Sequence, residues 1–236
     1  MTQNTVEVKN LVKTFGKFRA VDDVSFYIPQ GEIFGLLGPN GAGKTTTIRM
    51  LIGILRPDSG TANVLGFDVR KKPEEVKKRI GYMSQKFSLY NDLSVRENLD
   101  FYAAIYNDIS ARQRRLRVDE MLEMVDLKEI EKSLTKSLSG AWRQRLALAC
   151  SIIHKPKMLF LDEATAGVDP VARRYFWDLI YRLAGEGISV LATTHYMDEA
   201  DYCNTIGMMY QGRLVSLASP DTIKDSLPGV LLQVDV

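Results

Sequence analysis

The chain has 236 residues, of which 45% are hydrophobic and 25% are charged, and its formal net charge is +2. This length and composition suit one globular domain, or two small lobes, with a core that needs no disulfide bonds. A net charge so close to zero gives no general electrostatic case for nucleic-acid binding, and no apolar run approaches the ~18–20 residues of a membrane-spanning helix.

The first part of the chain is predicted to form an antiparallel β layer. Residues 6–11 alternate between apolar and polar side chains, as does part of 24–28. Phe15 lies between these segments, where its ring can stack on a purine or simply fill a space beside a turn. Residues 1–10 are polar and contain no signal-peptide core, so we expect any link to a membrane to come through a partner.

The stretch at residues 38–46 carries the strongest signal in the chain. It fits the pattern G-x-x-x-x-G-K-T and lies between an apolar run, 33–37, and a helical pattern, 46–55. Its glycines permit positive φ, and the backbone N–H groups and the helix N-terminus can then face a polyphosphate. Lys44 is expected at the β- and γ-phosphates and Thr45 at Mg²⁺. The predicted nucleotide-binding residues are Gly38, Pro39, Asn40, Gly41, Ala42, Gly43, Lys44, Thr45 and Thr46.

The next apolar strand, residues 80–83, ends at a polar amide. A turn cluster at 55–60 closes the first helix, and the charged stretch 70–79 is expected to be a solvated helix or loop. Gln85 follows the strand directly, and the carboxyl ends of strands are where ligands of open parallel sheets bind. Gln85 is therefore a candidate to bind Mg²⁺ or a water molecule, with an ordinary loop glutamine as the alternative.

Residues 94–135 are predicted to form a helical lobe inserted in an α/β core. A capping-box pattern at 94–97 opens a helix to about Tyr106, and 111–125 has apolar residues at partly helical spacing. The arginines of the second helix can contact nucleic acid or form a solvated face. Acidic residues beside them favour the solvated face, so no nucleic-acid partner is predicted.

A further helix is expected to open at Ser139 and run to about His154. Ser139 is a good N-cap. It either only caps this helix or, with Gly140, forms a second phosphate-binding helix terminus. His154 is expected to interact with the dipole at the end of the helix. Cys150 in the same helix, like Cys203, is predicted to pack in the core of a protein from a reducing compartment.

Residues 157–163 predict a buried parallel strand that ends in two carboxylates. Because successive side chains of a strand point to opposite sides, the two acids are expected to have different tasks. Asp162 is expected to hold Mg²⁺ through water. Glu163 is expected to orient or deprotonate the attacking water. An Asp-Glu pair at the end of an apolar strand is common by itself. Its occurrence downstream of a phosphate loop makes the prediction of a catalytic site specific.

The last part of the chain alternates helix and strand once more. Asp169 and Pro170 are an N-cap and a first helical residue, and an apolar stripe follows to residue 183. The strand 188–192 ends at Thr193-Thr194-His195, which makes His195 a candidate for γ-phosphate contact. A hairpin over 205–218, a short helix from Ser219 and an apolar run at 230–236 complete the chain; the run is consistent with a fragment of a longer polypeptide.

Taken together, the motifs resemble the ATP-binding subunit or domain of an ABC transporter over nearly the whole chain. The strings at 82–90 and 93–98 are similar to those of bacterial ABC-2-type exporter ATPases of the drug-efflux branch. The resemblance implies an α/β P-loop NTPase with a mostly parallel core sheet, an antiparallel β layer and an inserted helical lobe. It implies a single ATP-binding domain over 1–236, with a core at about 1–93 and 136–226 and a helical subdomain at 94–135. The remaining residues, 227–236, are expected to be a tail in which a longer polypeptide could be cut short.

The resemblance also implies a role for each motif. Phe15 matches the aromatic that stacks on adenine, Asp169 the D-loop and His195 the switch histidine. Gln85 matches the glutamine that senses Mg²⁺ and faces the membrane partner. The implied catalytic residues are Glu163, His195, Lys44 and Gln85; the implied metal ligands are Thr45, Gln85 and Asp162; Phe15, Ser139, Gly140 and Asp169 join the phosphate loop in nucleotide binding.

The signature segment of this family, LSGGQ, is matched by residues 138–142 with two departures. In the family this segment caps the γ-phosphate of the ATP that a second copy binds. Ser139 and Gly140 are retained, whereas Ala141 replaces a glycine and Trp142 the glutamine. Two interpretations stay open: the altered residues are merely degenerate, or they are specifically required.

The implied function is an ATPase, with ATP and Mg²⁺, that powers export. Two copies, or one copy and a paralogous domain, are expected to close around two ATP molecules. A transmembrane permease subunit or domain is expected as partner, at the cytoplasmic side of the cell membrane. Two alternatives remain: a soluble ABC ATPase of repair or translation, and a regulatory, weakly hydrolysing cassette. The absence of sustained heptads between Lys44 and Ser139 opposes the first, and Glu163 and His195 oppose the second.

Overall fold

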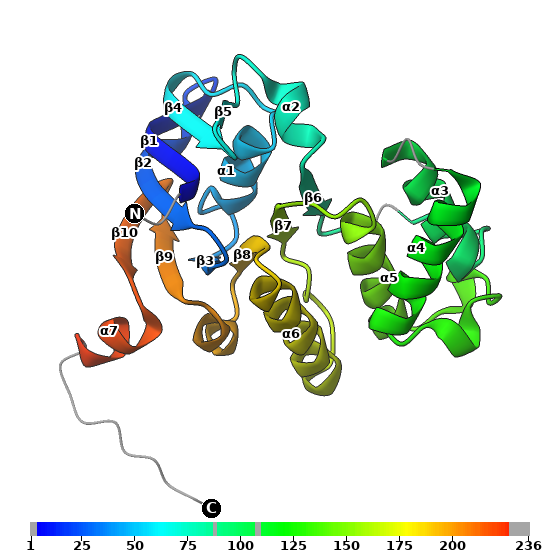
Figure 1. Ribbon diagram of the computed structural model, residues 1–236. Coiled ribbons are helices and arrows are strands. Elements are labelled where there is room, and N and C mark those ends of the chain that lie inside the picture. The colour runs from blue at the N-terminus through cyan, green and yellow to red at the C-terminus, as the bar shows by residue number, and fades with distance from the viewer. Residues whose placement is uncertain (1–3, 87–88, 107–109, 227–236) are drawn as a thin grey trace, which may run out of the picture.

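The computed structural model describes residues 4–86, 89–106 and 110–226. Two sheets face each other on one side of the molecule, and a group of helices stands apart on the other (Figure 1). The expected tail at 227–236 lies outside the described residues, as do residues 87 and 88 of the exporter-like string.

The smaller sheet is the antiparallel layer that the alternating segments predicted. Its strand order is β2-β1-β4-β5, with antiparallel pairing throughout. The strands alternate in burial over much of their length because one face covers the core and the other meets solvent. The strands are β1 Asn4–Phe15, β2 Phe18–Pro29, β4 Ser59–Val64 and β5 Phe67–Asp68.

The larger sheet has the order β10-β9-β3-β8-β7-β6 and is parallel except for the final hairpin. Every residue of β3, β7 and β8 is buried, which explains the apolar run in each of these strands. The parallel arrangement brings the carboxyl ends of β3, β8, β7 and β6 to one edge. The strands are β3 Ile33–Leu37, β6 Ile80–Met83, β7 Met158–Asp162, β8 Ser189–Thr194, β9 Thr205–Tyr210 and β10 Arg213–Ala218.

Four helices accompany the sheets. Helix α1, Lys44–Leu51, packs between the two sheets, and it is shorter than predicted because the chain turns at Gly53, where φ is +72°. Helix α6, Pro170–Gly185, covers the other face of the larger sheet through its predicted apolar stripe. Helices α2, Pro73–Lys77, and α7, Pro220–Asp225, are short and lie on the surface.

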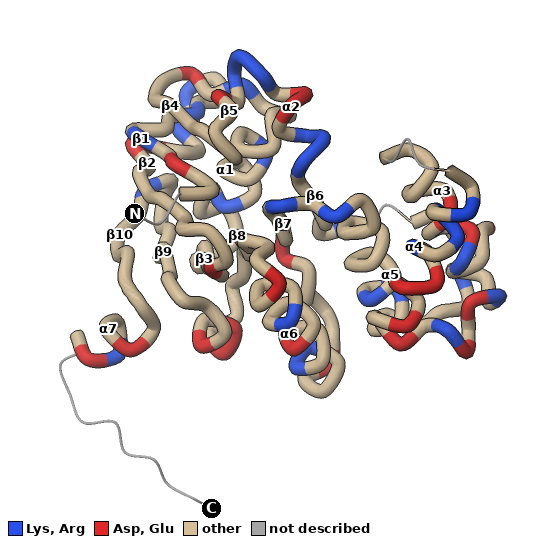
Figure 2. Tube along the Cα trace, in the orientation of Figure 1, with Lys and Arg blue, Asp and Glu red and all other residues tan. Residues whose placement is uncertain are grey.

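The helical lobe consists of α3, Val95–Tyr106, α4, Ala111–Met124, and α5, Gly140–Ile152. Two short 3₁₀ turns, Lys128–Ile130 and Thr135–Ser137, connect α4 to α5. The predicted capping box is present, since the Glu97 carboxylate accepts the Ser94 N–H at 2.7 Å. Basic and acidic residues are interspersed along the chain of the lobe (Figure 2), as expected of a solvated face.

His154 makes a different contact from the one predicted. Its Nε2 lies 2.9 Å from the carbonyl oxygen of Ile80, and its ring stacks on Tyr106 with 4.3 Å between centroids. Burial lowers the pKa of His154 and favours the neutral ring. The expected interaction of a charged histidine with the end of its own helix is therefore wrong: the ring joins the lobe to the start of β6.

The two cysteines are buried and unpaired, as predicted. Burial raises the pKa of Cys203 to about 12, so the thiol stays protonated and unreactive near neutral pH. Among the described residues, none of the helices has both the length and the apolar character needed to cross a bilayer.

Candidate functional site

The loops that follow β3, β6, β7 and β8 meet at one edge of the larger sheet. The convergence follows from the parallel register, because Leu37 pairs with Thr194 and Asp162 with Thr193. A cavity of about 450 Å³ opens there. It is lined by Phe15, Phe18, Ala20, Asn40, Gly41, Gly43, Lys44, Thr45, Thr46, Gln85 and Glu163.

The phosphate loop wraps the start of α1 and packs tightly against its neighbours. Gly43 has φ +108°, and a Cβ there would lie 2.4 Å from the carbonyl oxygen of Ala20. A Cβ on Gly38 would lie 2.1 Å from the carbonyl oxygen of Met209. These positions exclude any larger residue, so the sequence pattern reflects close backbone packing as well as positive φ.

Lys44 is held in the middle of this loop, with only 4% of its surface exposed. Its Nζ donates hydrogen bonds to the carbonyl oxygens of Gly38, at 2.7 Å, and Pro39, at 3.1 Å. The same atom lies 3.3 Å from Oε1 of Glu163. A buried ammonium with a single carboxylate neighbour is well placed to accept further anionic oxygen atoms, such as those of a polyphosphate.

Asp162 is the buried acid of the site. Its Oδ1 accepts hydrogen bonds from the hydroxyls of Thr45, at 2.8 Å, and Thr193, at 3.0 Å. This set of hard oxygen ligands suits Mg²⁺, which takes one or two carboxylates and completes its shell with phosphate oxygens and water. That fits the finding that the described residues contain no group of three or more His, Cys, Asp or Glu able to hold a metal alone.

Thr193 was not predicted as a site residue. Its hydroxyl donates to Asp162 and accepts the backbone N–H of Glu163 at 3.0 Å, so it fixes both acids relative to β8. The signal in the sequence was the polar pair Thr193-Thr194 at the end of an apolar strand. We placed it in the loop, whereas the structure extends β8 through Thr194.

Glu163 lies at the centre of the polar groups. Its Oε2 accepts a hydrogen bond from Nε2 of Gln85 at 3.0 Å and lies 3.8 Å from Nδ1 of His195. Lys44 approaches its other oxygen. The backbone of Glu163 has φ +50°, which is strained for a residue with a side chain. Residues with such strained backbone conformations cluster at functional sites. The tight turn aims its carboxylate away from Asp162 toward the cavity.

The loop that carries His195 is braced by a cluster that the sequence did not reveal. Glu199, which is 1% exposed, accepts a hydrogen bond from the Thr165 hydroxyl and lies 3.5 Å from Nε of Arg173. The Arg173 guanidinium also lies 4.1 Å from the ring centroid of Tyr196, the neighbour of His195. The cluster thereby joins the loop after β8 to the segment that follows Glu163.

The predicted adenine contact lies at the tip of the β1–β2 hairpin. Phe15 is about half exposed and lines the cavity, as does the more exposed Phe18. Lys13 Nζ lies 5.6 Å from the Phe15 ring centroid. Phe18 was not among the predicted site residues, and its position places two exposed rings at this end of the cavity.

Three predicted nucleotide contacts that lie outside the phosphate loop do not line this cavity. Ser139 caps α5 by accepting the N–H of Trp142 at 3.4 Å, and Gly140 next to it meets open space. Asp169 caps α6 by accepting the N–H of Ala172 at 3.0 Å. The Ser139, Gly140 and Asp169 residues are exposed. The structure thus gathers the lysine, threonine, glutamine, acids and histidine, and leaves the signature turn facing outward.

A larger cavity, of about 720 Å³, lies at the opposite ends of the same strands. Its two arginines are already engaged: Arg79 pairs with Glu75 at 2.6 Å, and Arg117 donates to the carbonyl of Ile153 at 2.8 Å. None of the predicted phosphate, metal or catalytic residues is in the lining of this cavity.

Known proteins are similar to this chain in both sequence and fold. A family model described as ABC transporter matches residues 21–166. The probable multidrug ABC transporter ATP-binding protein YbhF of Escherichia coli is 47% identical over 94% of this chain, but the chain spans only 38% of that protein. The daunorubicin/doxorubicin resistance ATP-binding protein DrrA of Streptomyces peucetius is 40% identical over 97% of this chain and 69% of its own length.

Two solved structures show how closely the fold is shared. CbiO1 of Clostridium perfringens, part of the ABC transporter complex CbiONQ, is 28% identical and superposes with a TM-score of 0.87 over 94% of this chain and 91% of its own. The ATP-binding cassette MJ0796, solved as a dimer in a post-hydrolysis state with ADP and phosphate, is 25% identical with a TM-score of 0.82 over 91% and 98% of the two chains. The expected ABC-type α/β fold is thereby confirmed.

Proposed function

The chain belongs to the ABC transporter family, and on that premise we propose that it is the ATP-hydrolysing motor of a membrane exporter. The observation that carries the proposal is the convergence of Lys44, Gln85 and His195 on one carboxylate, Glu163, beside the Thr45–Asp162 pair. The exporter assignment draws on relatives named for multidrug transport and drug resistance.

Hydrolysis of ATP requires little covalent chemistry from the protein itself. Water attacks the γ-phosphorus, the bond to the bridging oxygen of ADP breaks, and inorganic phosphate leaves. Glu163 is the group that takes the proton of the attacking water. Gln85 and His195 hold this carboxylate and the water in place. Lys44 stabilises negative charge on the transferred group from within a nearly dry pocket.

Thr45 and Asp162, with Gln85, would hold Mg²⁺, which neutralises charge on the phosphate oxygens. In the structure Thr45 donates to Asp162 at 2.8 Å, so the two oxygens are already held together. Phe15 would stack on the adenine. The loop residues 38–46 supply the remaining phosphate contacts through backbone N–H groups and the start of α1.

A second ATP-binding domain is proposed to complete each site. Ser139 and Gly140 are exposed and lie outside the cavity of their own chain, so they are free to contact the γ-phosphate held by another copy or by a paralogous domain. The relative MJ0796 is a dimer in its post-hydrolysis state. In this scheme the core covers about 1–93 and 136–226 and the helical subdomain covers 94–135. Helix α5, which stands with α3 and α4 in the structure, begins after that proposed boundary.

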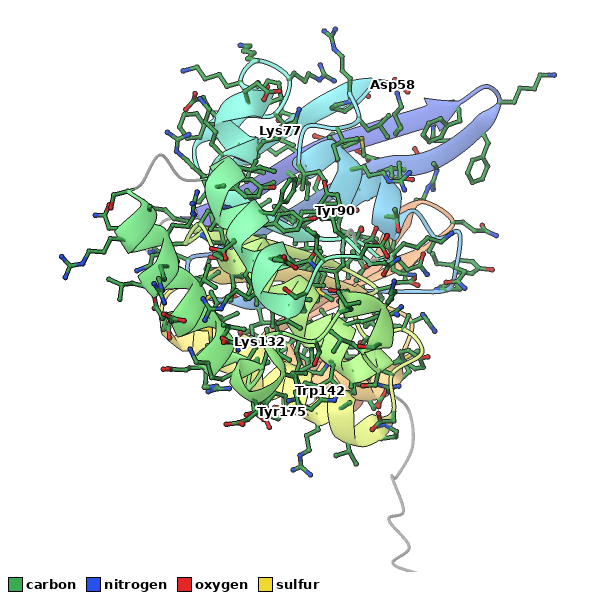
Figure 3. All side chains as sticks on the ribbon, turned by 90° about the vertical axis from the view of Figure 1, so that its right-hand side faces the viewer. Asp58, Lys77, Tyr90, Lys132, Trp142 and Tyr175 are labelled. Atoms are coloured by element: carbon green, nitrogen blue, oxygen red, sulfur yellow. The ribbon has the colours of Figure 1, made fainter. Side chains whose placement is uncertain are left out.

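A transmembrane permease is proposed as the partner that receives the motion, on the cytoplasmic side of the cell membrane. Five residues after Gln85 in the chain, the exposed Tyr90 (labelled in Figure 3) packs edge to face on Phe101 of α3, with 4.6 Å between ring centroids. Exposed aromatic side chains that cluster mark interaction surfaces. The mixed charge of the lobe supports no nucleic-acid partner.

The test is Glu163→Gln, which keeps the shape of the side chain and removes the base. We expect steady-state phosphate release to fall about a hundredfold to ten-thousandfold, while ATP still binds and traps a dimer. Glu129→Gln, the same change at an exposed position of the helical lobe, serves as the matched control. Unchanged phosphate release in Glu163→Gln would rule out the proposed role of this residue.

A further inference from the structure

The first turns of α5 and α6 are joined by a stack of three side chains. The Arg145 guanidinium lies 3.7 Å from the ring centroid of Tyr175 on α6 and 5.0 Å from that of Trp142 on α5. Figure 3 shows Trp142 and Tyr175 next to each other where the two helices approach. Trp142 is the residue that replaces the glutamine of the family signature. We name this set the Arg145 stack.

The stack is partly buried and its rings contribute most of the contact. The Arg145 side chain is 17% exposed, and both Trp142 and Tyr175 pack against the main hydrophobic core. The guanidinium also pairs with the carboxylate of Asp126, which is 3.6 Å away and 72% exposed, so water screens this pair strongly. A partly desolvated guanidinium over aromatic faces is a favourable arrangement, and tryptophan is the best partner for it.

The stack lies between elements that the proposed mechanism must align. Helix α5 starts at Gly140, directly after Ser139, and α6 starts directly after Asp169. One turn along α5, Gln144 Nε2 donates a buried hydrogen bond to the carbonyl oxygen of Ala164, the residue after Glu163, at 2.8 Å. The signature turn is therefore tied to the catalytic acid through Gln144 and to α6 through Arg145.

We propose that the Arg145 stack sets the orientation of the signature turn, and that Trp142 is a positioning residue for closure on the ATP of a second copy. The inference rests on the proposed function. A glutamine at position 142 has no aromatic face, so it would leave Arg145 stacked on Tyr175 alone. In this proposal Trp142 is specifically required, which is the second of the two interpretations that the sequence left open for this residue.

The experiment uses the Glu163→Gln chain as parent and measures dimerisation by sedimentation at saturating Mg-ATP. Trp142→Gln is expected to raise the protein concentration for half-dimerisation about fivefold to tenfold, since a cation–π contact of this kind is lost. Trp142→Tyr keeps an aromatic face and is expected to retain most of the affinity. Binding of a fluorescent ATP analogue to the monomer should not change, which separates positioning of the turn from a general structural defect.

A second pair of variants tests the other side of the stack without touching the signature. Tyr175→Leu removes the ring on α6 and is expected to weaken dimerisation to a similar extent, while Tyr175→Phe is expected to behave as the parent. Because both rings act through Arg145, the double variant Trp142→Gln/Tyr175→Leu should be less impaired than the product of the two single effects.

The outcomes separate this inference from the proposed function. If the parent dimerises with Mg-ATP and the Trp142→Gln and Tyr175→Leu variants dimerise as tightly as the parent, the role of the stack is overturned and the proposed function is not. Two single effects that multiply in the double variant would also overturn it, because the rings would then act independently. A Glu163→Gln parent that stays monomeric with Mg-ATP would overturn the proposed function and the stack's role in closure together.

Discussion

The polyphosphate cavity and the signature turn present their polar groups in opposite ways. In the cavity, Lys44 and Asp162 are almost fully buried and are held by partners from other elements. At the signature turn, Ser139 and Gly140 are exposed, and Ser139 bonds only to its own helix among the contacts described. One region is assembled within the chain, whereas the other contacts the ATP of a second copy in our proposal.

The contrast has a physical origin in how each region is supported. The cavity groups follow adjacent parallel strands, so the hydrogen-bonded register of the sheet fixes their spacing. The signature turn belongs to the helical lobe, and it is connected to the core through side chains such as Gln144 and Arg145. Side-chain links can be adjusted with less cost than a sheet register, which suits the part that has to move.

The largest expected effect that tests this contrast is a loss of nucleotide binding by the monomer. Lys44→Ala should weaken binding of ATP to the monomer about a hundredfold to a thousandfold, because a buried cation that meets the phosphates is removed. Equilibrium binding of a fluorescent ATP analogue measures this. Lys136→Ala, a change beside the signature where the lysine pairs with an exposed aspartate, serves as control and should bind normally. Equal losses in both variants would contradict the division between the two regions.

The same contrast explains what the sequence could and could not predict. Strand β6 was predicted with its observed bounds, and the hairpin of β9 and β10 covers the predicted residues 205–218, because turns and polar residues delimit short apolar runs. The cavity groups were found because each follows a recognisable run: the glycine loop, the paired acids, and the histidine after a strand. Local pattern and topology suffice where a sheet does the positioning.

The missed features all depend on side chains that meet across long stretches of chain. Thr193 fixes Asp162 from another strand, and Glu199 binds Thr165 from a separate loop. His154 was assigned to its own helix, yet its ring contacts the start of β6. No periodicity in a single sequence records such pairs. The stacking of Trp142 on Arg145 is of the same kind, since its third member comes from α6.

A second test concerns the brace behind His195. Glu199→Gln keeps an oxygen that can accept from Thr165 but removes the charge that faces Arg173. We expect the free energy of unfolding to fall by about 2 kcal/mol, because a charge-assisted contact inside the protein is lost. Urea denaturation measures it, with the exposed Glu186→Gln as control. A variant as stable as the parent would show that Asp198 alone satisfies Arg173.

The smallest expected effect is also the sharpest comparison, because serines cap more than one helix of the lobe. Ser139 caps α5 and Ser110 caps α4, the latter within a full capping box with Gln113. Either serine changed to alanine should lower the free energy of unfolding by about 1 kcal/mol. Only Ser139→Ala should also weaken Mg-ATP-dependent dimerisation of the Glu163→Gln chain, since only that hydroxyl faces the second copy in our proposal. If Ser110→Ala weakened dimerisation equally, the signature turn would matter only through the stability of its lobe.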